Sequence, residues 1–198
     1  LHPDYREVLD VLDMQLVQYG SALIQRRQTF AEELGEIVHR IHSQLSGGQE
    51  EMELKYEPNV TVDAFAQMLF SNRERDMRLK TTATGPHRDD ISFVVNGVDI
   101  RKFGSQGQQR TAALSLKLSE IELVKRLIGD TPVLLLDDVL SELDSGRQNY
   151  LLNSIENIQT LITCTGLDEF VNHRFSINRI YKVTDGSVTV ENKQEADR

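Results

Sequence analysis

The chain has 198 residues, of which 39% are hydrophobic, and its formal net charge is −9. This composition is typical of a soluble globular protein with a real core, and no apolar run approaches the ~20 residues that span a bilayer. We therefore expect no membrane contact and a cytoplasmic location, and the acidic balance excludes a generally basic nucleic-acid binder.

Positive charge is concentrated in the middle of the chain. Residues 73–126 hold 11 Lys and Arg side chains against 7 Asp and Glu, whereas both flanking blocks are acidic. Charge alone favours a phosphate-facing surface and an ordinary solvated surface about equally. The candidate DNA-binding residues are Arg73, Arg75, Arg78, Lys80, Arg101 and Lys102.

Apolar residues recur at helical spacing through residues 4–45. They are Leu9, Leu12, Leu16, Leu23, Phe30, Leu34, Ile37, Ile41 and Leu45. The pattern predicts one or two long amphipathic helices. An antiparallel helical arm is favoured over a coiled coil, because fewer than three or four clear heptads are present.

Short strands and one helix are predicted next. Residues 52–56 alternate as a strand does, and Thr61 can cap a helix with an apolar face through Phe70. Asn96-Gly97 predicts a type I′ turn in a hairpin over residues 91–100.

A turn at Gly85-Pro86 precedes His87. Without a nucleophile nearby, this histidine is interpreted as structural, bonded to Asp89 or Asp90, rather than catalytic.

An anion-binding helix start is predicted at Gly104-Ser105. A long helical pattern follows, with Leu114, Leu118, Ile121, Val124 and Ile128 on one face. Free backbone N–H groups and the helix dipole favour an anion at such a start. The Ser105 hydroxyl and the Arg110 charge would add to the site.

The segment PVLLLDDVLSELD, residues 132–144, predicts a strand that ends in acidic residues. The apolar run Val133–Leu136 suits a strand covered on both faces in a parallel sheet. Asp137 and Asp138 then lie at the strand end, where open α/β sheets bind ligands. Adjacent strand side chains point to opposite faces, so the two carboxylates divide their roles unless the backbone turns after Leu136. The alternative is that the pair simply caps a turn.

The remaining chain predicts a helix, a strand and a hairpin. Asp144 or Ser145 can cap the helix, and an apolar strand runs from Gln159 to Thr165. The single cysteine, Cys164, lies in this run, and we expect it to pack rather than react. A second hairpin is expected over residues 177–190.

In order and spacing, three motifs resemble the signature, Walker B motif and D-loop of ABC-type ATPases. They are Ser-x-Gly-Gln at 105–108, the strand ending in Asp137-Asp138, and Ser-x-Leu-Asp at 141–144. Together with GPHRDD at 85–90, and with Gln15-Leu16, Gly20, Arg27 and Phe30 upstream, they resemble the RecF family of recombination mediators over nearly the whole chain. This chain has Lys80 where we would expect glycine in that family.

The resemblance implies an α/β fold: an ABC-ATPase-like (P-loop NTPase) lobe with parallel-sheet core strands, plus a helical arm subdomain. We expect the arm at residues 1–75 and the C-terminal part of the ATPase lobe, with signature, Walker B motif and D-loop, at 76–198.

The resemblance also implies ATP and Mg²⁺, held between two subunits. Asp137 would hold the metal through water, and Asp138 would act as the catalytic base. The partner subunit would supply Ser105, Gln106, Gly107 and Gln108. Ser141 and Asp144 belong to the D-loop, and Thr165 takes the switch position where ABC ATPases place a histidine.

By resemblance, the protein is an ATP-dependent homodimer that binds DNA, especially single-strand/double-strand junctions, and works with a RecR-like mediator to load recombinase at gaps. DNA repair, replication, recombination and the SOS response follow as expected contexts, with a cytoplasmic, nucleoid-associated location. The alternatives are a non-hydrolysing DNA- or RecR-binding structural fragment and, less favoured, a transporter-type ABC ATPase.

The chain begins with Leu1, and no G-x-x-x-x-G-K-[ST] pattern occurs in it. The resemblance places that Walker A loop in an amino-terminal half, so we expect a fragment that alone neither binds ATP tightly nor hydrolyses it.

A second signature-like run, LSGGQ, occupies residues 45–49. It follows the end of a predicted helix and leads into Glu50, Glu51 and a strand rather than into a helix. Two glutamates would repel a phosphate, so this run is interpreted as a helix stop and turn.

Overall fold

The computed structural model describes residues 5–165 and 177–191 and divides into two compact units, Leu1–Thr131 and Pro132–Arg198. The first unit contains α1 (Tyr5–Leu45), β1 (Met52–Glu57), α2 (Val62–Leu79), η1 (Pro86–Arg88), β2 (Asp90–Val95), β3 (Val98–Asp99), α3 (Ile100–Phe103) and α4 (Gln106–Ile128). The second contains β4 (Leu134–Asp137), η2 (Leu140–Glu142), α5 (Ser145–Ser154), β5 (Thr160–Thr163), β6 (Ile180–Thr184) and β7 (Ser187–Glu191). The arm and lobe boundaries expected at residues 1–75 and 76–198 stay a prediction.

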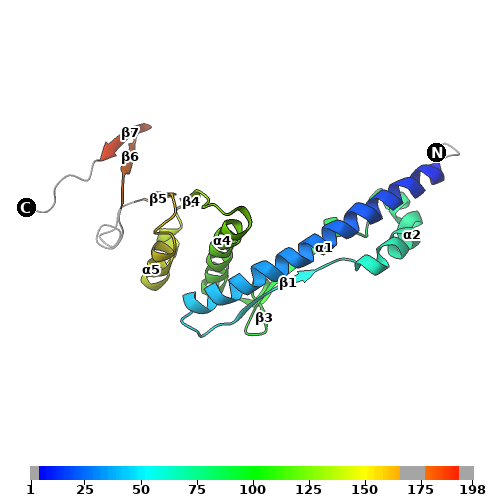
Figure 1. Ribbon diagram of the computed structural model, residues 1–198, viewed down its shortest axis with the longest axis horizontal. Coiled ribbons are helices and arrows are strands. Elements are labelled where there is room, and N and C mark those ends of the chain that lie inside the picture. The colour runs from blue at the N-terminus through cyan, green and yellow to red at the C-terminus, as the bar shows by residue number, and fades with distance from the viewer. Residues whose placement is uncertain (1–4, 166–176, 192–198) are drawn as a thin grey trace, which may run out of the picture. The chain divides into compact units, whose positions relative to one another are not determined.

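The first predicted helical segment is one continuous helix, α1, of 41 residues (Figure 1). Its buried face differs in part from the predicted stripe. Leu34, Ile37 and Ile41 are buried as expected, but Leu16 and Leu23 are 48% and 42% exposed. Ahead of Leu34 the helix instead buries small or offset residues, namely Gly20, Ile24 and Ala31.

Helix α2 returns along the amino-terminal half of α1, antiparallel to it (Figure 1). The contacts show the direction, because Arg73 late in α2 bridges to Asp10 near the start of α1, whereas Phe65 early in α2 lies against Gly20. A Cβ at Gly20 would lie 2.5 Å from the Phe65 ring, so glycine allows this close approach.

Helix α2 ends at a left-handed residue. Lys80 is its C-cap, with φ 53° and ψ 36°. Glycine adopts this conformation without steric cost, which gives a physical reason for expecting glycine at this position.

The strands of the first unit form an antiparallel sheet in the order β1-β2-β3. Met52 pairs with Val95, and both are buried. Asn96 and Gly97 have φ values of 49° and 82°, as the predicted type I′ turn requires. The second strand of the hairpin is shorter than expected, because Ile100 begins α3.

Helix α4 packs on the carboxy-terminal half of α1 through small hydroxylated residues. Thr111, Ser115 and Ser119 are fully buried at i, i+4 spacing, and each hydroxyl donates to the carbonyl four residues earlier. These internal bonds satisfy the hydroxyls, and the small side chains let the two helices lie close together.

In the second unit, β4 and β5 are parallel, as predicted. The expectation of full burial is wrong for this strand in the described residues: Leu136 is buried, but Leu135 and its register partner Leu161 are 72% and 55% exposed. The described part of this unit places α5 residues, including Leu151 and Leu152, in the core while leaving the opposite face of the two strands open. The closing hairpin β6–β7 turns at Asp185-Gly186, as predicted.

Candidate nucleotide site

Ser105 is the N-cap of α4, so the predicted helix start is confirmed. A reciprocal capping box closes the first turn: the Ser105 hydroxyl accepts from the Gln108 N–H at 3.2 Å, and the Ser105 N–H donates to the Gln108 side-chain oxygen at 3.0 Å. Gln106 and Gly107 are exposed between the two capping residues. Their backbone N–H groups belong to the first turn of the helix, where an anion is favoured.

The Glu50 carboxylate contacts both the capping box and His42. One of its carboxylate oxygens accepts from the Gln108 amide at 3.0 Å, and the other lies 3.1 Å from Nε2 of His42. His42 is fully buried, and its Nδ1 lies 3.0 Å from the Ser115 hydroxyl. The start of α4 is therefore joined by hydrogen bonds to the end of α1.

The LSGGQ run at 45–49 is a helix stop, as predicted. Helix α1 ends at Leu45, and Gly47 and Gly48 have φ values of 64° and 78°. The Ser46 hydroxyl is half-buried and contacts the backbone N–H of Glu50 at 3.2 Å. The run leads into β1 rather than into a helix start, so it offers no anion site of the kind found at Ser105.

The backbone turns at Asp138. This residue has a φ of 51°, a left-handed conformation that Asp tolerates better than most residues. Its N–H donates to the Thr163 carbonyl at 3.1 Å and contacts the Thr163 hydroxyl at 3.2 Å, while that hydroxyl donates to the Asp137 carboxylate. Asp137 thus ends the strand and Asp138 begins the turn, so both acidic side chains are exposed at the carboxyl end of β4.

The D-loop residues shape the next turn. The Ser141 hydroxyl donates to the Asp138 carbonyl at 2.8 Å. Asp144 is the N-cap of α5 and accepts from the Arg147 N–H at 3.0 Å. That hydrogen bond, together with the Arg147 guanidinium, lowers the pKa of the Asp144 carboxyl below its usual range.

Sequence reasoning missed Thr163, which contacts both members of the acidic pair. The available signal was register, because a parallel neighbour places Thr163 opposite Asp137. Thr165 lies in an exposed bend two residues later, and its switch role stays a prediction. The neighbouring Cys164 is exposed, so the expectation that it packs is wrong: the strand ends at Thr163, before this residue.

The chemistry of Asp137 fits Mg²⁺. Its carboxylate is exposed at a strand end and is oriented by the Thr163 hydroxyl, and magnesium takes one or two such hard oxygens while keeping several waters. Across residues 5–165 and 177–191, no cluster of three or more His, Cys, Asp and Glu side chains is gathered in the manner of an all-protein metal cage.

The GPHRDD segment is organised by Asp89, whose side chain is 3% exposed. It accepts hydrogen bonds from Arg27 of α1, Tyr56 of β1 and the Asn59 N–H. Burial and then the bond to Asp89 raise the pKa of Tyr56 to about 12. The structural interpretation of His87 named the wrong partner. Its Nε2 lies 2.8 Å from the Thr82 carbonyl. Asp89 and Asp90, the expected partners, instead form ion pairs with Arg27 and Arg101, respectively.

Comparison with known proteins identifies the family. No protein-family model matches the chain. The curated DNA replication and repair protein RecF of Lachnospira eligens is 59% identical over 186 residues, which are 94% of this chain and 51% of that protein. The RecF protein of Clostridium perfringens is 41% identical over 187 residues, 92% of this chain and 52% of that protein. A solved structure described as the recombination mediator protein RecF-ATP in the RecFOR pathway matches with a TM-score of 0.81 and 34% identity, covering 93% of this chain and 50% of that chain.

The chain belongs to the RecF family. It matches the carboxy-terminal half of RecF and spans about half the length of the curated relatives. The predicted ABC-ATPase-like α/β fold is therefore confirmed.

The candidate DNA-binding residues of this RecF half differ in whether their charges already form ion pairs with acidic side chains. Arg73 is bound by Asp10 and Asp13 and lies 5.3 Å from the centre of the Phe70 ring. Arg101 pairs with Asp90, and Lys102 pairs with Asp99. By contrast, Arg75, Arg78 and Lys80 are exposed and form no ion pair with another residue in the described part of the chain.

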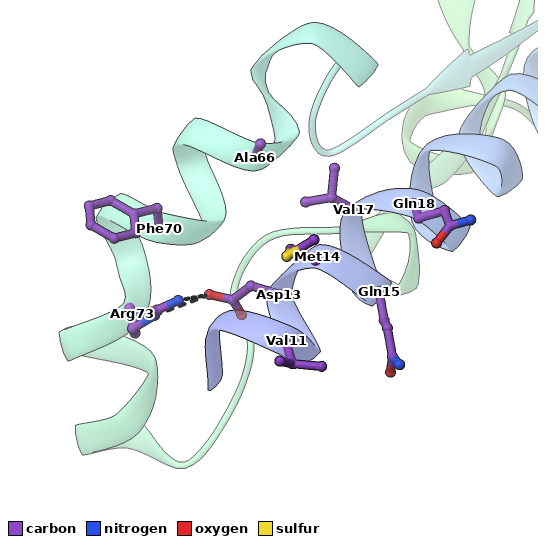
Figure 2. A pocket seen from close by; sticks show the side chains of 9 residues that line it. All are labelled: Val11, Asp13, Met14, Gln15, Val17, Gln18, Ala66, Phe70 and Arg73. Atoms are coloured by element: carbon purple, nitrogen blue, oxygen red, sulfur yellow. Dashed lines mark hydrogen bonds and ion pairs between the residues drawn. The ribbon is translucent and has the colours of Figure 1, made fainter. Parts of the chain in front are cut away.

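Arg73 closes one end of an apolar groove of about 660 Å³ between α1 and α2 (Figure 2). It is lined by Val11, Met14 and Val17 of α1 and by Ala66 and Phe70 of α2. In the described residues, no helix is both long and apolar enough to cross a membrane.

Proposed function

We propose that this RecF half belongs to an ATPase in which ATP joins two subunits around DNA. The observation that supports the proposal most strongly is the match to RecF-ATP, in a chain whose Ser105 begins a helix and whose Asp137-Asp138 pair ends a strand. A helix start can bind phosphate oxygens, and a strand-end acidic pair can serve metal and water.

The two motifs divide the work between subunits. Asp137, oriented by Thr163, would hold Mg²⁺ through water, and the metal would supply charge neutralisation at the phosphates. Asp138 would accept a proton from the attacking water. Ser105, Gln106, Gly107 and Gln108 would meet the nucleotide bound by the partner subunit, through the exposed amides of the first turn of α4.

Nucleotide state would control assembly. Contacts from the signature residues to the γ-phosphate exist only in the closed dimer, so ATP binding favours closure and hydrolysis removes those contacts. The D-loop residues Ser141 and Asp144 would act indirectly, because they hold the turn and the helix that follow Asp138. Thr165 would take the switch position.

The closed dimer would bind DNA, with single-strand/double-strand junctions as the preferred form, and would act with a RecR-like mediator in recombinase loading. Arg75, Arg78 and Lys80 are the strongest of the candidates for phosphate contact, because their charges are exposed and unpaired among the described residues. Arg73, Arg101 and Lys102 would have to exchange existing ion pairs. Repair, replication, recombination and the SOS response are the proposed contexts, at the nucleoid in the cytoplasm.

A non-hydrolysing DNA- or RecR-binding role is the second candidate for the 198 residues by themselves. The observation that favours it is the lack of a G-x-x-x-x-G-K-[ST] pattern in this sequence, whose amides and lysine would cradle the β- and γ-phosphates.

The test uses a full-length chimera in which this chain replaces the matching half of the Lachnospira eligens relative. Light scattering would measure its mass with and without ATP and Mg²⁺. We expect ATP to produce a dimer of the parent but not of Ser105→Arg, whose bulk and misplaced charge block closure. Ser71→Arg, on the exposed surface of α2, is the matched control and should dimerise like the parent. A Ser105→Arg chimera that dimerises normally would contradict the proposal.

A further inference from the structure

A polar connection runs from inside the α1–α4 contact to the signature residues. Ser115 and His42 are fully buried, and Glu50 is 21% exposed at its side chain. From the helix contact outward, Ser115 contacts His42, His42 contacts Glu50, and Glu50 contacts Gln108. Gln108 in turn accepts from the Ser105 N–H.

Burial of these groups has an energetic cost that a purely structural contact would avoid. A buried imidazole beside a carboxylate must keep its hydrogen bonds, and apolar residues of similar volume pack as well or better. Two other buried hydroxyls of this helix contact show the cheaper solution, because Thr111 and Ser119 each donate to a carbonyl of their own helix. His42 and Glu50 instead direct polar atoms to α4, His42 to Ser115 inside the helix and Glu50 to Gln108 at its start.

The carboxylate of Glu50 selects one orientation of the Gln108 amide. Ionised Glu only accepts hydrogen bonds, so the NH₂ group of Gln108 must face Glu50. The amide oxygen of Gln108 then faces the Ser105 N–H, which completes the capping box. The opposite orientation of the amide would place two donors together at Ser105 and two acceptors together at Glu50.

We propose that Glu50 is a positioning residue for the signature, and that His42 orients Glu50. The pair keeps Ser105 and Gln108 bonded to each other, which leaves the N–H groups of Gln106 and Gly107 aimed outward for phosphate oxygens. The half-buried Ser46 contributes by holding the Glu50 backbone through its hydroxyl. The signature-like run at 45–49 is therefore the support of the signature rather than a second copy of it. This inference rests on the proposed role of Ser105.

The experiment compares Glu50→Gln with Glu51→Gln in the full-length chimera. The two substitutions are chemically identical and adjacent, but the Glu51 side chain is exposed. In Glu50→Gln a neutral amide replaces the carboxylate, so the charge-assisted hydrogen bonds that Gln108 and His42 make to this position are weakened. We expect hydrogen exchange at the amides of Ser105 and Gln108 to rise about fivefold, and the ATP concentration for half-maximal dimerisation to rise similarly. Glu51→Gln should match the parent in both.

A second variant separates orientation from general loss of stability. The double substitution Glu50→Gln and Gln108→Glu exchanges acceptor and donor, and a glutamate at position 108 still accepts from the Ser105 N–H. Slow exchange at the amides of Ser105 and position 108 should return. ATP-dependent dimerisation should not return, because position 108 would carry a negative charge near the phosphates.

Three outcomes would overturn the inference. The first is equal behaviour of Glu50→Gln and Glu51→Gln. The second is faster hydrogen exchange in Glu50→Gln with no change in the ATP concentration for half-maximal dimerisation, because that result marks a structural role alone. Failure of the double variant to restore slow exchange is the third. Normal dimerisation of Ser105→Arg, by contrast, would defeat the proposed function itself.

Discussion

Substitutions at Asp138 separate catalysis from turn formation, because this residue carries both a carboxylate and a left-handed backbone. Its backbone makes the observed contacts: the N–H bonds to Thr163 and the carbonyl accepts from Ser141. At φ 51° glycine is unstrained and Asn is tolerated, whereas Ala costs about 1 kcal/mol. Asp138→Gly and Asp138→Asn therefore keep the turn and remove only the base, and Asp138→Ala disturbs both.

The catalytic account makes a specific prediction for this series in the full-length chimera. All three variants should hydrolyse ATP at least about 10²-fold more slowly than the parent, which corresponds to about 2.7 kcal/mol of barrier. Only Asp138→Ala should also lose about 1 kcal/mol of unfolding free energy in urea titrations. Steady-state phosphate release is the assay. Parental rates in Asp138→Gly and Asp138→Asn, with a defect only in Asp138→Ala, would show that the acidic pair is a turn and refute the reasoning.

Three further predictions concern packing, pH and DNA. Gly20→Ala should destabilise the chain by about 1–3 kcal/mol in urea titrations, because its Cβ meets the Phe65 ring, whereas Gly35→Ala in the same helix meets nothing closer than 3.7 Å and should stabilise it by about 0.5–1 kcal/mol. Asp144→Asn should cost no more than about 0.5 kcal/mol at neutral pH, because the group is half-exposed. Because the folded pKa of Asp144 is lowered, this difference should hold above the usual pKa of 3.8 and be lost as pH falls through the lowered pKa, as urea titrations at a series of pH values from 7 downward can show. Arg75→Glu should weaken DNA binding and reduce its salt dependence, measured by fluorescence anisotropy at several salt concentrations, and unchanged binding would remove Arg75 from the interface.

Elements with local signals were predictable from the sequence. The two hairpins turn at Asn96-Gly97 and Asp185-Gly186, where positive φ is required and where those residue types are favoured. The helix start at Ser105 followed from Gly104-Ser105 ahead of a long helical pattern, and the strand before Asp137 followed from its apolar run. In each case a few consecutive residues hold all the information.

Features that depend on distant partners were missed. The α1–α4 contact buries His42 and Ser115, which no hydrophobic pattern marks, because their partners lie on the other helix. Leu16 and Leu23 share helical spacing with the core, but the position of α2 selects Gly20 and Ile24 instead. The role of Thr163 required strand register, which is a property of two segments rather than of one.

Subunit complementation tests the composite nucleotide site most directly. Full-length chimeras carrying Ser105→Arg and Asp138→Asn would be assayed for ATP hydrolysis separately and as an equal mixture. A mixed dimer has one site with both substitutions and one site with neither, because each site takes Asp138 from one subunit and Ser105 from the other. The account predicts that each variant alone is inactive and that the mixture regains hydrolysis. A mixture no more active than its two components would contradict a site shared between subunits.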